Sequence, residues 1–348
     1  MVNASKMSKF QSKLIIIAVL SIACFVLYLY VHPAFKDPDY SKSSSFKLQV
    51  ETVTESIQTM SSKVMNDKEK VLAAARRVTV NGNTLLVSFI NYAYLPFAYS
   101  WLCNTKGMNI HHKVLIIASD EETEKDLKKK RPEIETVSIS GFKINGPQRY
   151  TRAGYVRIGI KRTEVLNWIL QDNIGIFLFE FDCLWVKNPV PEMIKYVDHD
   201  LVITPVAERP GMVAIGFYYM APTDRMKKLW QELTRRLLLL DARLQKLSPG
   251  TVISEGDNDQ LYLTALLNKK YANVRVKLLS LKEYPDGKWY ELPAAKRRDI
   301  SKIYILNNNW VEGNQNKIKR AEKWGHWFVT EDNNTCDMEK VNKIVQLS

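Results

Sequence analysis

The stretch Gly175–Pro189, which reads G-I-F-L-F-E-F-D-C-L-W-V-K-N-P, decides the fold. Its apolar run at 176–179 is short and unbroken, which is typical of a strand buried on both faces of a mostly parallel sheet. Glu180 and Asp182 follow that run, at the strand end where open α/β sheets bind ligands. Such carboxylates point to the same side of an extended chain, and together they favour a divalent cation. The alternative is a solvated strand end.

Strand and helix patterns alternate on both sides of this stretch, which predicts a parallel sheet. Further strands are expected over residues 85–90, 113–118, 134–139, 200–204, 211–220 and 303–306. Helices are expected over residues 152–170, 191–197, 223–240 and 257–267. The predicted fold class is therefore α/β, with a mostly parallel sheet flanked by helices.

The chain is basic, with 50 Lys and Arg against 37 Asp and Glu and a formal net charge of +13. Nucleic-acid binding is one interpretation of such an excess. A basic surface also suits a protein close to a membrane that binds anionic phosphates. Because a candidate membrane segment is present and no nucleic-acid motif is found, we expect no nucleic-acid partner.

Residues 14–31 carry no charge and follow three lysines. At 1.5 Å per residue such a helix is about 27 Å long, enough for a thin bilayer. Lysines before the segment predict a cytosolic N-terminus. We expect a single-pass type II membrane protein with a cytosolic tail over 1–13, a signal anchor over 14–31, a polar stem over 32–79 with a helix at 64–77, and a lumenal domain over 80–348. A cleaved signal peptide is the alternative.

The acid-x-acid strand end and the residues up to Pro189 resemble the D-x-D-x-x-W-x-x-x-P block of the nucleotide-diphospho-sugar transferases. In this family, a glycine-aromatic strand, an Asp-Gln pair and an asparagine- or histidine-rich loop with a lysine follow in order, as they do here at 216–219, 259–260 and 307–317. The resemblance covers about residues 84–328. The family comprises type II Golgi glycosyltransferases of the GT-A fold, including plant arabinosyl- and xylosyltransferases.

The resemblance implies a GT-A-like domain in the Golgi lumen that moves a sugar from a nucleoside diphosphate, UDP, to a glycan or glycoprotein acceptor with retention of configuration. It implies that Asp182 holds Mn²⁺ or Mg²⁺, and that Glu180, where relatives have Asp, contacts the metal or the donor. Such an ion would act as a Lewis acid on the diphosphate. Asn308 stands among three asparagines where relatives place a metal-binding histidine, whereas His326 is expected to pack against tryptophans.

Four further residues receive roles from the same resemblance. Asp259 and Gln260 match the Asp-Gln pair near the donor sugar, and we assign them as catalytic. The alternative is a capping box in which Asp257 caps the helix and Gln260 completes it. Lys161 and Lys317 are assigned to donor binding; for Lys161 the alternative is a surface lysine.

Two questions stay open at this stage. The departures at Glu180 and at the missing histidine allow a second hypothesis, a catalytically inactive member of the fold that binds nucleotide or glycan. Of the four cysteines, Cys24 lies in the apolar segment, and the remaining three cannot all pair with one another.

Overall fold

The computed structural model describes residues 62, 64–80, 84–140, 144, 146–330, 332 and 335–346. The predicted tail, the signal anchor and the stem up to residue 61 lie outside these residues. Among the helices of the described ranges, none combines the length and the hydropathy needed to cross a membrane.

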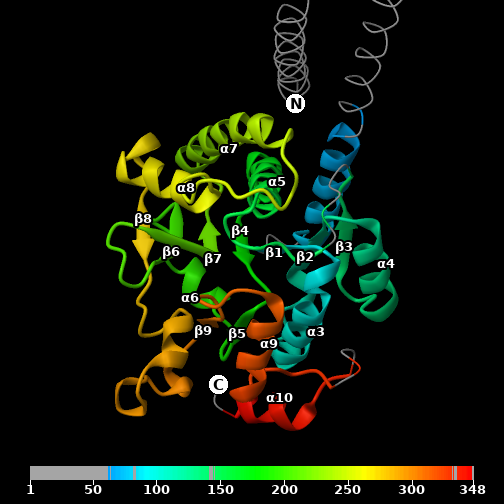
Figure 1. The fold of residues 1–348 in the computed structure, drawn as a ribbon, viewed down its shortest axis with the longest axis vertical. Helices are drawn as coiled ribbons and strands as arrows, with labels where there is room; N and C mark the ends of the chain where they lie inside the picture. Colours follow the sequence, from blue (N-terminus) through cyan, green and yellow to red (C-terminus); the bar gives the residue numbers. More distant parts are fainter. Residues whose placement is uncertain are drawn as a thin grey trace, which may run out of the picture. The chain divides into compact units, whose positions relative to one another are not determined.

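Within the described residues, seven strands form the central sheet in the order β3-β2-β1-β4-β7-β6-β8. Their bounds are β1 Leu85–Ile90, β2 Val114–Ala118, β3 Glu135–Ser138, β4 Ile176–Phe179, β6 Leu201–Pro205, β7 Val213–Met220 and β8 Val276–Leu278. Only β7 runs antiparallel, against β4 and β6, while the other neighbouring pairs are parallel. The predicted mostly parallel sheet is confirmed, and β4 lies at its centre with all four residues buried (Figure 1).

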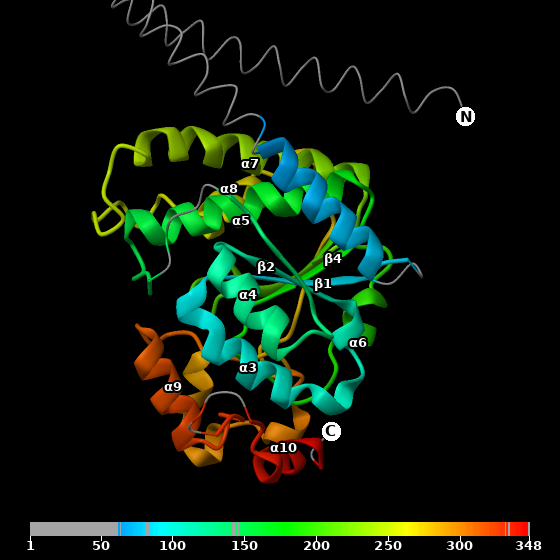
Figure 2. The same cartoon turned by 90° about the vertical axis from the view of Figure 1, so that its right-hand side faces the viewer.

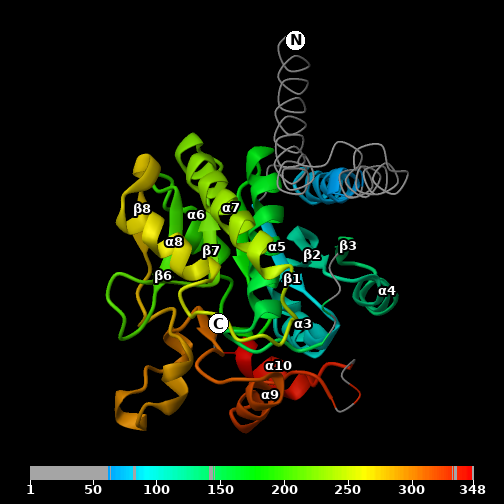
Figure 3. The same ribbon diagram turned by 45° about the horizontal axis from the view of Figure 1, so that its top comes forward.

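Helices cover both faces of this sheet (Figures 1 and 2). One face packs against α5 (Ala153–Gln171), α7 (Asp224–Leu244) and α8 (Asp259–Asn268). α5 and α7 lie side by side (Figure 3). The other face packs against α3 (Leu95–Asn104), α4 (Glu121–Lys130), α6 (Val190–Ile194), α9 (Asn314–Lys323) and α10 (Met338–Val345). A two-stranded sheet of β5 (Cys183–Trp185) and β9 (Ile305–Asn307) lies on this second side.

A helix over residues 64–78 belongs to the folded unit, although the sequence placed it in the stem. Val71, Ala74 and Ala75 on this helix are fully buried in the core on the α5 side. Lys70 also pairs with Glu124 at 3.3 Å. The compact unit therefore begins at Val64 rather than at residue 80, because a small apolar cluster inside a polar stretch covers the sheet.

A disulfide joins Cys103 on α3 to Cys336, just before α10. Cys183 is a free, buried thiol in β5. The structure thus settles the pairing that the sequence left open, and it ties the C-terminal segment to a helix of the main core.

Candidate active site

The chain turns sharply where β4 ends, so the expected extended conformation does not continue through the two acids. Glu180 donates its backbone N–H to the Gly216 carbonyl on β7 (2.8 Å), and its own carbonyl accepts from the Cys183 N–H (3.1 Å). β5 then leaves the main sheet to pair with β9. Glu180 and Asp182 therefore pair with two different basic side chains of the protein.

Arg162 on α5 holds two of the acids together. Its Nη1 donates to Glu180 Oε1 at 2.9 Å, and its Nη2 donates to Asp259 Oδ2 at 2.8 Å. The guanidinium side chain is only 11% exposed. Burial disfavours its charge, yet Asp259 and Glu180 hold the pKa of Arg162 well above its usual value. Gly159, one turn earlier, leaves room for Asp259, because a Cβ there would stand 2.8 Å from Oδ2.

Lys161, the basic residue on this helix that the sequence suggested for donor binding, does not pair with Glu180 or Asp259. Its Nζ pairs with Glu164 at 2.8 Å and lies over the Trp168 ring at 5.1 Å. Neighbouring helix residues point about 100° apart, so only one of the two can face the end of β4. Arg162, rather than Lys161, is the cation that α5 contributes.

Asp182 is buried instead of facing solvent, and Lys317 on α9 is its partner. Lys317 Nζ donates to Asp182 Oδ2 at 2.5 Å, and the aspartate side chain is 1% exposed. Burial acts against the ammonium, but Asp182 keeps the pKa of Lys317 well above its usual value. Burial, and next the charge of Asp182, raise the pKa of Glu180. We call Arg162, Glu180, Asp182, Asp259 and Lys317 the site cluster.

The buried oxygens that lack a hydrogen-bond partner within the described residues include Asp182 Oδ1 and Asn307 Oδ1. β9 sets Asn307 opposite Cys183, next to Asp182. The Asn307 amide also meets Gly216, where a Cβ would stand 2.1 Å from Nδ2 and 3.5 Å from Glu180 Oε2. These oxygens are the hard ligands that Mg²⁺ and Mn²⁺ prefer.

Asn308, the predicted metal ligand, is already engaged. Its Oδ1 accepts from Arg320 Nε at 2.7 Å, and its Nδ2 donates to the Lys317 carbonyl at 3.0 Å. Asn307, one residue earlier, is the asparagine with an available oxygen. Across the part of the chain that the structure describes, no group of three His, Cys, Asp or Glu side chains is arranged for a metal. An ion here would therefore need this amide oxygen besides the carboxylates.

The Asp-Gln pair opens α8. Asn258, not Asp257, is the N-cap, and its Oδ1 accepts from the Leu261 N–H at 2.9 Å. Asp259 is buried against Arg162, and its Oδ1 accepts the backbone N–H of Gln260 at 3.1 Å. The capping-box alternative is thus replaced by an Asn cap, which leaves the Asp259 carboxylate to the site cluster.

A cavity of about 730 Å³, open to solvent, lies beside the site cluster. Polar residues that directly follow β1 and β2 line it together with α5 and the site cluster: Asn91, Ser119, Tyr94, Tyr155, Gly159, Arg162, Glu180 and Asp259. Asn91 and Ser119 were missed from the sequence. The rule that selected Glu180, a polar residue at the carboxyl end of a strand, could have found both.

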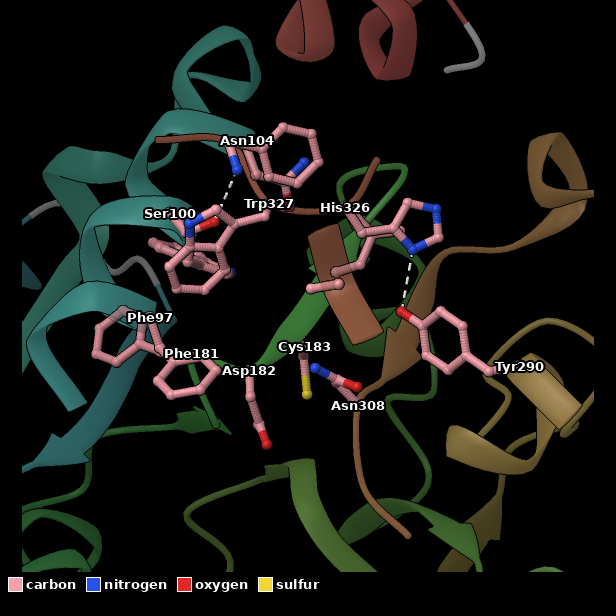
Figure 4. A pocket seen from close by; sticks show the side chains of 14 residues that line it. Phe97, Ser100, Asn104, Phe181, Asp182, Cys183, Tyr290, Asn308, His326 and Trp327 are labelled. Carbon is pink, nitrogen blue, oxygen red and sulfur yellow. Dashed lines mark hydrogen bonds between the residues drawn. The ribbon is translucent and has the colours of Figure 1, made fainter. Parts of the chain in front are cut away.

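A second cavity of about 320 Å³ adjoins Asp182 on the side of α3 and the C-terminal segment (Figure 4). Aromatic side chains such as Phe97 and Phe181 line it. His326 Nδ1 and the Tyr290 hydroxyl are 3.0 Å apart, and burial lowers the pKa of His326 to about 4. His326 also lies against Trp324, as expected.

Gly216→Ala tests the contact between β7 and Asn307. The new Cβ would stand 2.1 Å from Asn307 Nδ2, so we expect the amide to shift and the protein to lose about 1–3 kcal/mol, as in other overpacked sites. Thermal unfolding measures the effect. Gly250→Ala, where no atom lies within 4 Å of the new Cβ, is the matched control. Equal behaviour of the two variants would contradict the contact.

Comparisons with known proteins identify the family to which the chain belongs. Residues 109–321 match the sequence profile of a family described as nucleotide-diphospho-sugar transferase. The chain therefore belongs to the nucleotide-diphospho-sugar transferase family, and it is a glycosyltransferase. Membership implies a nucleotide-sugar donor and a glycan acceptor.

Individual relatives carry more specific names. The "UDP-D-xylose:L-fucose alpha-1,3-D-xylosyltransferase" of Arabidopsis thaliana is 25% identical over 74% of this chain and 72% of its own length. The "UDP-galactose:fucoside alpha-3-galactosyltransferase" of Dictyostelium discoideum is 20% identical over 55% of this chain and 31% of its own length. Among solved structures, the glycosyltransferase GlyE of Streptococcus pneumoniae TIGR4 covers 75% of this chain and 63% of its own, with 12% identity and a TM-score of 0.43.

Proposed function

We propose that this chain is a retaining glycosyltransferase of the GT-A type that transfers a sugar from a UDP-sugar to a glycan or glycoprotein acceptor. The observation that carries the proposal is the site cluster at the carboxyl end of β4, beside a cavity of about 730 Å³. Two cations there face three acids, which suits a ligand carrying a diphosphate and a divalent ion. The family match supports the donor class, and the UDP in the names of relatives supports the nucleotide.

We propose Mn²⁺ or Mg²⁺ as the cofactor, held by Asp182 and Asn307 with help from Glu180. The two unpaired buried oxygens support this, because unsatisfied buried oxygens are costly unless a ligand binds them. When bound, the ion would supply a Lewis acid for the departing diphosphate. In this proposal Asn307 is the metal ligand, instead of Asn308, which was expected from the sequence.

The chain's own residues have separate tasks in this proposal. The nucleotide occupies the cavity formed by α5 and the residues after β1 and β2. Arg162 holds Glu180 and Asp259 in place, with one guanidinium nitrogen on each carboxylate. Asp259 faces the donor sugar, where a carboxylate would stabilise positive charge that develops as the glycosidic bond breaks, and Gln260 stands beside it. Lys317 neutralises the diphosphate.

A UDP-sugar panel tests the function. The panel includes UDP-xylose, UDP-arabinose and UDP-galactose, with Mn²⁺ or Mg²⁺ and an array of glycan acceptors. Fucosides are the first acceptors to try, because fucose or fucoside stands in the names of both relatives described above. We expect transfer from at least one donor, and NMR of the product is expected to give the donor's anomeric configuration. Absence of both transfer and donor hydrolysis across the panel would overturn the proposal.

We also propose that the protein is a single-pass type II protein of the Golgi membrane, with the folded unit that begins at Val64 in the lumen. The uncharged segment 14–31 after lysines supports this orientation. The Cys103–Cys336 disulfide supports it independently, because disulfides persist in the secretory pathway and are rare in the cytosol.

A C-terminal tag should therefore be protected from protease in intact microsomes and digested after detergent is added. An N-terminal tag is the internal control, since we expect protease to remove it without detergent. Digestion of the C-terminal tag in intact microsomes would overturn the topology.

A further inference from the structure

Lys317 pairs with one of the two oxygens of Asp182, the carboxylate proposed to hold a divalent ion. Its Nζ lies 2.5 Å from Asp182 Oδ2, and the aspartate side chain is 1% exposed. The other oxygen, Oδ1, has no hydrogen-bond partner within the described residues. A buried carboxylate needs a compensating charge. In the structure, Lys317 supplies that charge.

We propose that Lys317 is an exchangeable counter-ion, which neutralises Asp182 in the empty site and moves to the diphosphate when donor and divalent ion bind together. The idea rests on the proposed function and concerns how its ligands assemble. Two cations on one carboxylate repel each other, and a partly buried site screens that repulsion poorly. The ion alone must therefore compete with Lys317. When a diphosphate is bound as well, the ammonium group of Lys317 has a second anion with which it can pair.

The local structure lets the ammonium group move while the backbone stays fixed. The Lys317 N–H donates to the Gly313 carbonyl at 3.2 Å, and the Lys317 carbonyl accepts from Asn308 Nδ2 at 3.0 Å. The lysine side chain itself is flexible. Tyr94 lines the large cavity and interacts with the charge of Lys317. The ammonium group therefore lies close to the space assigned to the nucleotide.

Arg162, the other cation of the site cluster, cannot exchange in the same way. Two separate nitrogens of its guanidinium bind Glu180 and Asp259. Moving it would leave two carboxylates without their cation, one of them buried. The exchange is therefore assigned to Lys317.

The exchange makes the two ligands depend on each other. UDP must raise the affinity for Mn²⁺ by the same factor by which Mn²⁺ raises the affinity for UDP, since coupling between sites is reciprocal. Without Lys317, the ion should bind to the empty site more tightly, and UDP should add less.

Mn²⁺ binding to the full-length protein, followed by electron paramagnetic resonance of the free ion, tests this with and without UDP. For the wild type we expect Mn²⁺ to bind about tenfold tighter or more when UDP is present. Lys317→Gln should bind Mn²⁺ alone about tenfold tighter than the wild type, with a smaller further gain from UDP than the wild type shows. Lys317→Arg keeps the charge and should resemble the wild type. Lys319→Gln, which removes the same charge from an exposed position of α9, should also resemble it.

The exchange is overturned if Lys317→Gln binds Mn²⁺ alone no tighter than the wild type. Unfolding of that variant is checked by thermal melting. The wild type then provides a second test, because equal UDP affinity with and without Mn²⁺ also overturns the exchange. Sugar transfer is measured on the same preparations. If sugar is transferred but Lys317→Gln binds Mn²⁺ no tighter than the wild type, the exchange alone is overturned. If Lys317→Gln binds Mn²⁺ more tightly but the wild type shows neither transfer nor donor hydrolysis, the exchange is supported and the proposed function is overturned.

Discussion

Asp182→Asn is expected to lower sugar transfer by about a hundredfold or more. The amide keeps the size of the side chain but removes the charge that would hold the divalent ion. A Lewis acid lowers the activation free energy by several kcal/mol. Because each 1.36 kcal/mol changes the rate by a factor of ten, losing the ion should slow transfer by this amount. Glu180→Gln should cost less, because its side chain is 34% exposed and water can replace it. Turnover across a Mn²⁺ titration measures both effects.

The control for this experiment is Asp257→Asn. Asp257 lies close by in sequence to Asp259, but its carboxylate binds the Tyr262 hydroxyl and Arg243 instead of the site cluster. Asp182→Asn also leaves Lys317 without its partner, so the melting temperature should fall, and assays belong well below it. Near wild-type turnover of folded Asp182→Asn, with unchanged metal dependence, would remove the main support for the metal site.

Arg162→Met should be the most destabilising change in the site cluster. Removing one partner of a buried ion pair costs about 3–5 kcal/mol, and Arg162 serves the buried Asp259 as well as Glu180. The partial exposure of Glu180 favours the lower end of that range. Denaturant unfolding measures the loss.

Arg162→Lys separates folding from chemistry. An ammonium group keeps the charge but cannot reproduce the fork that reaches two carboxylates at once. We expect a folded protein in which transfer falls by about a hundredfold, the cost of misplacing a group by 1 Å. Lys161→Met on the same helix is the control, since Lys161 pairs with Glu164 instead. Equal activity of Arg162→Lys and Lys161→Met would contradict the role given to Arg162.

The sequence predicted the main strands to within two or three residues, because buried parallel strands are short apolar runs with clear limits. It missed β8 and β5. β8 is a partly exposed three-residue strand at the sheet edge, without an apolar run to mark it. β5 is three residues long, and its role depends on pairing with β9 more than a hundred residues later.

The sequence identified the acidic residues of the site cluster, but it identified only some of the residues that pair with them. Asp182, Glu180, Asp259 and Lys317 meet as the order of motifs implied. Lys161 and Arg162 are adjacent and both basic, and composition cannot tell which one faces β4. Asn307 and Asn308 raise the same difficulty on a strand, where successive side chains point to opposite faces. In both cases the two candidates are adjacent in the chain, and the register of the element decides which of them faces the site cluster.

The Cys103–Cys336 bond has a practical consequence for anyone who makes this protein. It closes a loop with a sequence separation of 233 residues, and the whole site cluster lies inside that loop. In the chain-entropy description, a cross-link of this span raises the free energy of unfolding by about 5 kcal/mol. Expression in a reducing cytoplasm, or storage with dithiothreitol, would forfeit that contribution and release α3 from the segment before α10. An oxidising host and thiol-free buffers are therefore conditions for measuring the activity of the folded enzyme.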